Sequence, residues 1–366
     1  MKFNIFSKKN NKEEKAFGEL ASHKRRVSEL RRDLVGGAWI VLATARGNRP
    51  HEISDHSVSK ERSPKKNCPF EDPQASGNGE PLLIYGDKSD WSLQVVANKY
   101  PAFSTEGECI EGGKCKVGCG HTIKRGLYSV RDGFGYHEIL ITRDHDKYFS
   151  QFTDEQASEV IKAYLERYNF LKKQDCIKYI AIFENHGKKA GASIYHPHAQ
   201  IMALPFLPSD IRRSLRGSAK YNSRHKRCVH CVMLSWELER GERVIYEEDS
   251  FVALCPFVSF GSFEIRIYPK LHQASFDQIT KSQITSFARA LRVSLGKLDK
   301  ALNNPPYNYF IHTAPLEKIG GYSHYHWHLE ILPTFDMDGG FELGTGVQIT
   351  TTAPEEAAKI LNKQKP

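Results

Sequence analysis

Two histidines flank a proline in the stretch YHPHAQIMALP, Tyr195 to Pro205. The apolar residues that follow are typical of a strand, in which side chains two positions apart share a face. His196, His198 and Gln200 are therefore expected on one face, and Pro197 holds the preceding residue extended. If His196 binds a metal, His198 is left free. A neutral imidazole is both a nucleophile and a leaving group at phosphorus, which suits transfer through a covalent intermediate.

This chemistry needs further groups around His198. The far ring nitrogen must donate to an acceptor such as a backbone carbonyl, so that the near nitrogen presents its lone pair. Gln200 can donate an amide hydrogen bond to a phosphoryl oxygen without adding charge. The preceding loop HGKKAGAS supplies Gly187, Gly191 and Ser193, whose backbone and hydroxyl donors could hold a phosphate.

Cysteine and histidine spacing predicts two metal sites. In the second half, the CVHC pair Cys228 and Cys231 offers two zinc ligands, with His272 as a third and one of His324, His326 and His328 as the fourth. His326 is favoured because it aligns with His196 of the first copy. In the first half, Cys68, His145 and His196 are joined by Glu71, which stands where a second cysteine would complete a CxxC pair. That site is predicted either to bind metal through a carboxylate or to be vestigial. A third group, Cys109, Cys115, Cys119 and His121, matches no common zinc spacing and is interpreted as a loop insertion, with a small third metal site as the alternative.

The elements that position these residues occur twice. Counted from His145 and from His272, both copies place Phe at +4, Thr at +8 and Gln at +11. Each copy continues with a helix-length amphipathic segment, a strand-like run, a Gly-containing loop and a strand with alternate histidines. This order predicts an α+β fold of two tandem repeats, with antiparallel sheets and helices packed against one face.

The second histidine strand, HYHWHLEILP, differs from the first. His324, His326 and His328 share a face, but Trp327 replaces the proline and Glu330 replaces the glutamine. A carboxylate would then face an incoming phosphate. The first copy is therefore predicted to be catalytic and the second structural.

Composition limits the class of protein. The 366 residues are 40% hydrophobic, enough for a substantial core, and no run reaches the roughly 18 apolar residues of a membrane helix. The polar start lacks a signal-peptide pattern, and eight cysteines are too few for a disulfide scaffold, so a cytoplasmic protein is expected. The net charge of +9 favours anionic partners. The expected organisation is a basic arm (1–30), a catalytic repeat (31–208), a basic linker (209–227) and a structural repeat (228–366).

The run FENHGKKAGASIYHPHAQ resembles the active-site signature of the galactose-1-phosphate uridylyltransferase family, a branch of the histidine triad superfamily. The segments GAWIVLATARGNRP, VVANKYPAF, HWHLEILP and GGFELGTG resemble other family elements in the same order. The resemblance implies a ping-pong exchange in galactose metabolism, in homodimers whose active sites draw on both chains. It also implies roles for individual residues: His198 as nucleophile, Gln200 and Ser193 on the transferred phosphoryl group, Asn98 and Asn185 along the nucleotide, Arg46 and Arg49 on phosphates, and the two ligand sets above on zinc.

Three positions depart from the family pattern. Glu71 stands at a cysteine position, Ala199 replaces a glycine, and Gly346 and Thr352 stand where a glutamate and a glutamine contact the hexose. A site without those groups would discriminate sugars less well. The acceptor is therefore open, because related branches use adenine nucleotides or inorganic phosphate.

The leading hypothesis is a nucleotidyltransferase that moves a nucleoside monophosphate between a nucleoside diphosphate sugar and a sugar 1-phosphate. The alternative on the same site is a phosphorylase or hydrolase. A zinc-containing nucleic-acid-binding protein is a second alternative, motivated by the charge and the CxxC pair, although the basic linker holds a single tyrosine. No membrane partner is expected.

Overall fold

The structure is a computed structural model that describes residues 28–48, 63–108, 114–116, 122–316, 321–335 and 338–365. The predicted basic arm lies outside these ranges except for its last three residues. Arg49, Cys109, Cys119 and His121 also lie outside, and only the backbone of Cys115 is described.

Ten strands form one sheet in which every neighbouring pair is antiparallel. In spatial order they are β12 (Val244–Glu247), β13 (Phe251–Leu254), β14 (Ile265–Pro269), β16 (His328–Pro333), β15 (Tyr307–His312), β10 (Tyr179–His186), β11 (His198–Leu204), β9 (Tyr136–Thr142), β4 (Trp91–Ala97) and β3 (Leu83–Gly86).

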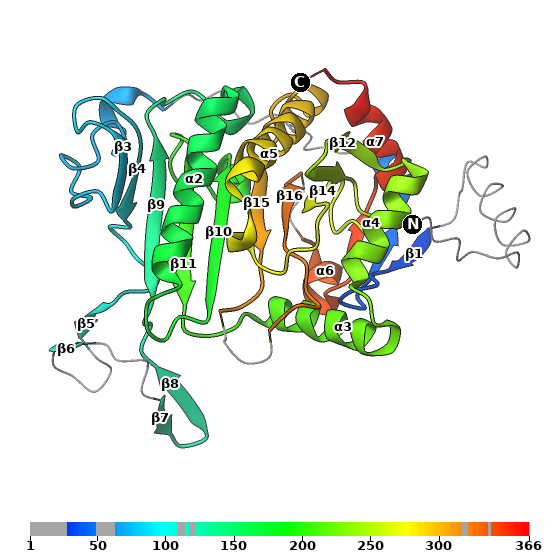
Figure 1. The fold of residues 1–366 in the computed structure, drawn as a ribbon, viewed down its shortest axis with the longest axis horizontal. Helices are drawn as coiled ribbons and strands as arrows, with labels where there is room; N and C mark the ends of the chain where they lie inside the picture. Colours follow the sequence, from blue (N-terminus) through cyan, green and yellow to red (C-terminus); the bar gives the residue numbers. More distant parts are fainter. Residues whose placement is uncertain are drawn as a thin grey trace, which may run out of the picture.

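The two repeats are visible in this order. Counting outward from the centre, β10, β11, β9, β4 and β3 of the first repeat mirror β15, β16, β14, β13 and β12 of the second. The β10–β15 pair joins the halves, with Phe183 opposite Phe310 and His186 opposite Tyr307. The predicted α+β class with antiparallel pairing is confirmed, and the two halves share one continuous sheet (Figure 1).

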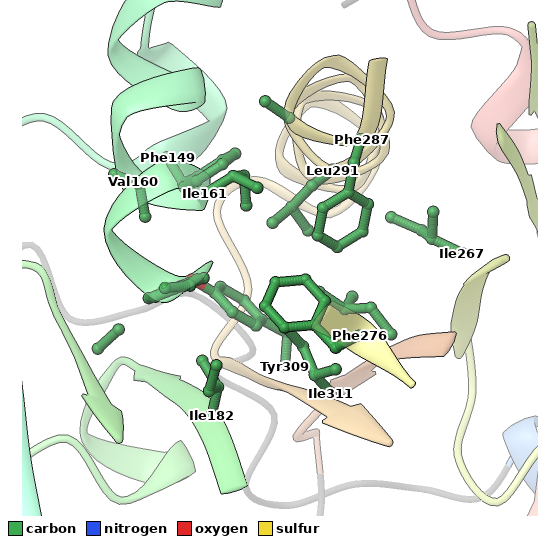
Figure 2. Close-up of a cluster of buried hydrophobic side chains, with 14 of the residues drawn as sticks. Phe149, Val160, Ile161, Ile182, Ile267, Phe276, Phe287, Leu291, Tyr309 and Ile311 are labelled. Carbon is green, nitrogen blue, oxygen red and sulfur yellow. The ribbon is translucent and has the colours of Figure 1, made fainter. Parts of the chain in front are cut away.

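The long helices of the two repeats, α2 (Asp154–Leu171) and α5 (Lys281–Leu302), cover the same face of the sheet (Figure 1). Figure 2 shows side chains of both helices meeting strand residues such as Ile182 and Tyr309. These residues belong to one continuous buried apolar cluster that spans both repeats. The predicted packing of helices on one face is confirmed.

The repeated Thr and Gln of the sequence begin these helices. Thr153 and Thr280 are the N-caps, and Gln156 and Gln283 lie at the third helical position, where they reach back to the cap backbone. The Thr153 amide donates to Gln156 Oε1 at 3.1 Å, and the Thr280 amide donates to Gln283 Oε1 at 2.9 Å. Such a capping box satisfies amides that the first turn leaves open.

The opposite face of the first half is covered by the segment around Cys68 and Phe70. These side chains pack with Ile139 and Ile141 of β9 in a second buried cluster. Leu140, which lies between them, packs toward the helices instead. The alternation of one strand thus separates the helix-covered core from the face that carries the histidines.

The predicted basic linker is helical, because Ser209–His225 form α3. The helix lies close to the turn after β1: a Cβ added to Gly217 would be 1.7 Å from the carbonyl oxygen of Val35. Glycine is required at that contact.

The remaining elements are a small sheet, two hairpins, three further helices and short 3₁₀ turns. They are β1 (Glu29–Arg32), β2 (Trp39–Leu42) and β17 (Gln348–Thr350); β5 (Glu106–Glu108) with β6 (Lys114–Lys116); β7 (Thr122–Arg125) with β8 (Tyr128–Arg131); α4 (Val229–Arg240), α6 (Gly340–Thr345) and α7 (Pro354–Asn362); and η1 (Thr44–Asn48), η2 (Lys65–Asn67), η3 (Phe149–Gln151), η4 (Lys188–Ala190) and η5 (Phe276–Gln278). Within the described ranges, no helix combines the length and apolar character needed to cross a membrane.

Candidate active site and metal-ligand groups

His198 is a buried residue at the start of β11, between β9 and β10. Its Nδ1 lies 2.9 Å from the carbonyl oxygen of His196. Since a carbonyl only accepts, Nδ1 carries the proton. Burial lowers the pKa of His198, although the bond to His196 opposes that shift. The neutral imidazole therefore presents its lone pair at Nε2, for which the described part of the chain offers no hydrogen-bond partner.

Gln200 lies on the same face, and its amide oxygen is occupied. Oε1 accepts a 2.8 Å hydrogen bond from Nε2 of His137 on β9. The other nitrogen of His137, Nδ1, accepts from the backbone amide of Ala102 at 3.1 Å. Burial lowers the pKa of His137, which keeps the ring neutral. The NH₂ group of Gln200 is left without a partner in the described structure.

Asn185, near the end of β10, is arranged in the same way. Its Oδ1 accepts a 2.8 Å hydrogen bond from Nδ2 of Asn308. Asn308 lies on β15, in the second repeat, and also donates to the carbonyl of Ala190 at 2.8 Å. A Cβ built on Gly191 would lie 3.8 Å from Asn185 Nδ2, so the NH₂ group, which has no partner among the described residues, points toward the glycine-containing loop.

The first predicted metal group is assembled. Ligand atoms of Cys68, Glu71, His145 and His196 all lie within 4.8 Å of one another. Oε1 of Glu71 is 2.8 Å from His145 Nδ1 and 3.5 Å from His196 Nδ1. The Cys68 sulfur is 3.6 Å from His196 Nδ1. Glu71 therefore completes a group of four side chains whose ligand atoms could hold a metal ion.

The second predicted group, Cys228, Cys231, His272 and His326, is also assembled within 4.8 Å. The Cys231 sulfur lies 3.2 Å from His272 Nδ1 and 3.4 Å from His326 Nδ1. A hydrogen bond from Cys231 lowers the pKa of the Cys228 thiol. A thiolate is the form that binds metals.

The histidines of both groups are held in the tautomer that a metal requires. Each uses Nε2 to donate to a backbone carbonyl and turns Nδ1 toward the other ligands. The carbonyls are those of Ser63 for His145 (2.9 Å), Thr142 for His196 (2.7 Å), Ser323 for His272 (2.7 Å) and Pro269 for His326 (2.9 Å). Orientation by an outer hydrogen bond is typical of metal-binding histidines, and four sulfur, nitrogen and carboxylate donors fit a tetrahedral ion.

His328 in the second repeat makes the same backbone contact as His198, but its other ring nitrogen has a partner. Nδ1 of His328 lies 3.1 Å from the carbonyl of His326. Its Nε2 is 3.2 Å from Oε1 of Glu330, which also pairs with the buried Arg266 at 3.1 Å. Hydrogen bonding to this carboxyl group occupies the nitrogen that is free in His198.

Three further predicted site residues are Asn98, Ser193 and Arg46. Asn98 directly follows β4, and its Nδ2 lies 3.1 Å from His137 Nε2, while its Oδ1 accepts from the Tyr100 amide at 2.8 Å. Ser193 is exposed in the loop before β11. Arg46 is not brought to His198.

Arg46 lies in η1, after β2 of the small sheet, and makes no side-chain hydrogen bond or ion pair with the residues that the structure describes. That sheet is attached to the second repeat: Arg31 on β1 pairs with Glu355 on α7 at 3.1 Å. Figure 1 shows β1 at the β14 side of the large sheet, away from β11.

His137 and Asn308 were not identified from the sequence as site residues. His137 directly precedes the repeated segment that begins at Glu138, and Asn308 is a polar residue inside the apolar run YNYFIHT. A polar residue that interrupts a buried strand is the available signal, because burial requires it to have a partner.

Comparison with known proteins covers both halves. Residues 18–208 match the model described as the N-terminal domain of galactose-1-phosphate uridyl transferase, and residues 214–360 match the model of its C-terminal domain. The chain is 33% identical over 349 residues to an ADP-glucose phosphorylase of Arabidopsis thaliana, covering 94% of this chain and 95% of that protein. It is 29% identical over 347 residues to a galactose-1-phosphate uridylyltransferase of Thermotoga maritima, covering 92% and 98%.

The fold comparison agrees. The crystal structure of an ADP-glucose phosphorylase from Arabidopsis thaliana with bound ADP-glucose matches with a TM-score of 0.78 at 31% identity. The match covers 93% of this chain and 100% of that one.

Proposed function

Because this chain belongs to the galactose-1-phosphate uridylyltransferase family, a family of nucleotidyltransferases, we propose that it transfers a nucleoside monophosphate through a covalent intermediate on His198. The donor is a nucleoside diphosphate sugar and the acceptor a sugar 1-phosphate. The observation that carries the proposal is the His198 ring, whose Nδ1 is held by the His196 carbonyl while Nε2 is free.

Two displacements at phosphorus complete the reaction. Nε2 of His198 attacks the α-phosphorus, a P–N bond forms, and the bond to the bridging oxygen breaks to release the sugar 1-phosphate. In the second step a phosphate oxygen of the acceptor attacks the same phosphorus, and the P–N bond breaks. The imidazole leaves as the neutral ring, with its proton still on Nδ1 and hydrogen-bonded to the His196 carbonyl, so no net proton transfer is needed. The NH₂ groups of Gln200 and Asn185 would donate to phosphoryl oxygens.

Inorganic phosphate is a second candidate acceptor. It is favoured by the 33% identity to a protein named ADP-glucose phosphorylase over nearly the whole chain. The hexose-contact positions of the uridylyltransferases also carry no matching side chain here. Gly346 ends α6 without any side chain, and Thr352 is short.

The two ligand groups would hold zinc in this proposal. A bound ion would cross-link the segments that carry its ligands and fix the His196 ring. Since the carbonyl of His196 holds His198, the first group connects metal binding to the orientation of the nucleophile.

A homodimer would account for the position of Arg46. In one chain this residue lies in η1, directly after β2 of the small sheet, and β1 of that sheet lies on the second-repeat side of the large sheet, away from β11. If two chains pair, Arg46 of one could reach a phosphate bound at His198 of the other. Mixing Arg46→Ala and His198→Ala proteins tests this arrangement: each alone should be inactive, and mixed dimers should regain activity. No recovery after subunit exchange would refute it.

Intact-protein mass after incubation with UDP-, ADP- and GDP-sugars, without acceptor, tests the central step. We expect an acid-labile adduct of one nucleoside monophosphate on the wild type and none on His198→Ala. Adding a sugar 1-phosphate or inorganic phosphate to the isolated adduct then identifies the acceptor that removes it. An adduct of equal yield on His198→Ala would refute the assignment of the nucleophile.

The nucleic-acid alternative has one structural feature in its favour. A groove of about 470 Å³ along α3 is lined by Arg212, Arg213, Arg216 and Lys220. If no donor labels His198, binding of labelled RNA or DNA, and its loss when these four residues are changed to Ala, would support that function instead.

A further inference from the structure

We propose that two residues outside the predicted site, His137 and Asn308, are positioning residues for the reaction. Each binds the carbonyl oxygen of a side-chain amide and leaves the NH₂ group of that amide toward the substrate. His137 orients Gln200 in this way, and Asn308 orients Asn185. The proposal rests on the proposed function. It adds the residues that orient the two amide donors, Gln200 and Asn185.

The orientation of the Gln200 side chain follows from the backbone amide of Ala102, which can only donate a hydrogen bond. This amide lies 3.1 Å from His137 Nδ1, so Nδ1 must be the unprotonated nitrogen. A neutral ring then carries its proton on Nε2. The shortest contact of Nε2 is to Gln200 Oε1 at 2.8 Å, and Asn98 Nδ2 at 3.1 Å is itself a donor. Gln200 must therefore turn its oxygen to His137 and its nitrogen away.

The segment around Asn98 holds the Ala102 amide in place for its hydrogen bond to His137. Asn98 Oδ1 accepts from the Tyr100 amide at 2.8 Å, which folds the segment into a turn. The turn brings the Ala102 amide to His137. The segment VVANKYPAF therefore determines, through one imidazole, which end of the Gln200 amide meets the ligand.

The orientation of Asn185 is fixed in the same manner, from an acceptor. The carbonyl of Ala190 can only accept, and Asn308 Nδ2 lies 2.8 Å from it, so this atom is the amide nitrogen. The same nitrogen lies 2.8 Å from the side chain of Asn185, which must present its oxygen there. The NH₂ group of Asn185 is then turned toward the loop at Gly191.

Phosphate explains why the direction matters. A phosphoryl group offers only acceptor oxygens, so an inward NH₂ group stabilises it and an inward amide oxygen repels it. His137 and Asn308 each prevent the amide oxygen from turning toward the substrate. Asn308 comes from β15, so the structural repeat contributes to the catalytic site of the first repeat.

The test compares variants that keep or remove the donor at each position. His137→Leu removes the N–H that donates to Gln200, whereas the side-chain amide introduced by His137→Gln can donate from a similar position. Asn308→Asp keeps the shape but replaces the donating nitrogen with an acceptor. Tyr136→Phe is the control, because Tyr136 neighbours His137 on β9 and its hydroxyl bonds instead to Gln174.

We would measure the single-turnover rate of His198 labelling and the affinity for the nucleoside monophosphate. Removing one direct donor to a developing charge lowers kcat about 10²–10³-fold in a well-studied protease, so we expect about 10–100-fold slower labelling for His137→Leu and Asn308→Asp. His137→Gln should recover most of the rate, and Tyr136→Phe should equal the wild type. In a Gln200→Ala background, His137→Leu should cause no further loss, because its effect acts through Gln200. If His137→Leu lowers the labelling rate by the same factor in the wild-type and the Gln200→Ala proteins, the positioning role is overturned.

The ¹⁵N tautomer of His137 separates failure of this inference from failure of the proposed function. A proton on Nε2 is expected, and a proton on Nδ1 overturns the inference whatever the activity. If the wild type forms no adduct, the proposed function fails. A proton on Nε2 together with weaker nucleoside monophosphate binding by His137→Leu would then still support the orientation of the amide.

Discussion

Glu184 is a buried carboxyl group whose ionisation should make the protein less stable as the pH rises. Burial raises its pKa from 4.5 to about 7, and one hydrogen bond, from the Tyr309 hydroxyl at 2.9 Å, only partly offsets this shift. Tyr309 in turn lies 2.7 Å from the Tyr164 hydroxyl, and no cation pairs with Glu184 among the described residues. The carboxyl group is therefore more easily ionised in the unfolded chain than in the folded one.

The sign and the size follow from the two pKa values. With the folded-state value raised, the contribution of Glu184 to stability is complete below pH 4.5 and is lost as the pH rises through about 7. At about 1.4 kcal/mol for each pH unit, the interval from 4.5 to about 7 corresponds to about 3 kcal/mol. Glu184→Gln keeps an acceptor for Tyr309 and cannot ionise, so it should lack this loss.

Urea unfolding of the wild type and Glu184→Gln at several values between pH 4.5 and 8 is the assay. The free energies of unfolding of the two proteins should be similar at the acid end, and Glu184→Gln should be more stable by about 3 kcal/mol at pH 8. The difference between the proteins cancels every other titrating group. A constant difference across the range, or a growing advantage of the wild type, would refute the reasoning.

Three other predictions concern the fold, the metal groups and the second repeat. Gly217→Ala places a Cβ 1.7 Å from the Val35 carbonyl oxygen, so α3 must shift; we expect about 1–3 kcal/mol of lost stability in chemical unfolding, and an unchanged midpoint would contradict that packing. Cys228→Ser should lower bound zinc by about one ion per chain and lower the melting temperature, as measured by plasma emission and calorimetry, whereas Cys255→Ser, a buried cysteine outside both groups, should retain its zinc. His328→Asn should leave labelling of His198 intact in the mass assay, because His328 Nε2 is occupied by Glu330; loss of the adduct in a folded variant would show that the second repeat takes part in the chemistry.

The sequence by itself identified the repeat, the α+β class and the members of both ligand groups. The repeat and the fold class depend on patterns within short segments, and the ligand groups were assigned from residue types and from the alignment of the two copies. The Thr and Gln repeated after His145 and His272 specify a capping box, which acts within the first turn of each helix, and the repeated Phe marks a buried core position. Likewise, the fixed alternation of a strand is enough to place His196, His198 and Gln200 on one side.

Only the tertiary structure decided how the halves meet and which atoms of the site are free. The pairing of β10 with β15 makes one sheet from two repeats and brings Asn308 to Asn185, residues far apart along the chain. The free nitrogen of His198 and the occupied one of His328 sit in similar sequence patterns, and their neighbours distinguish them. Hydrogen-bond direction depends on which donor or acceptor lies opposite, and a sequence pattern specifies the residue types without specifying that partner.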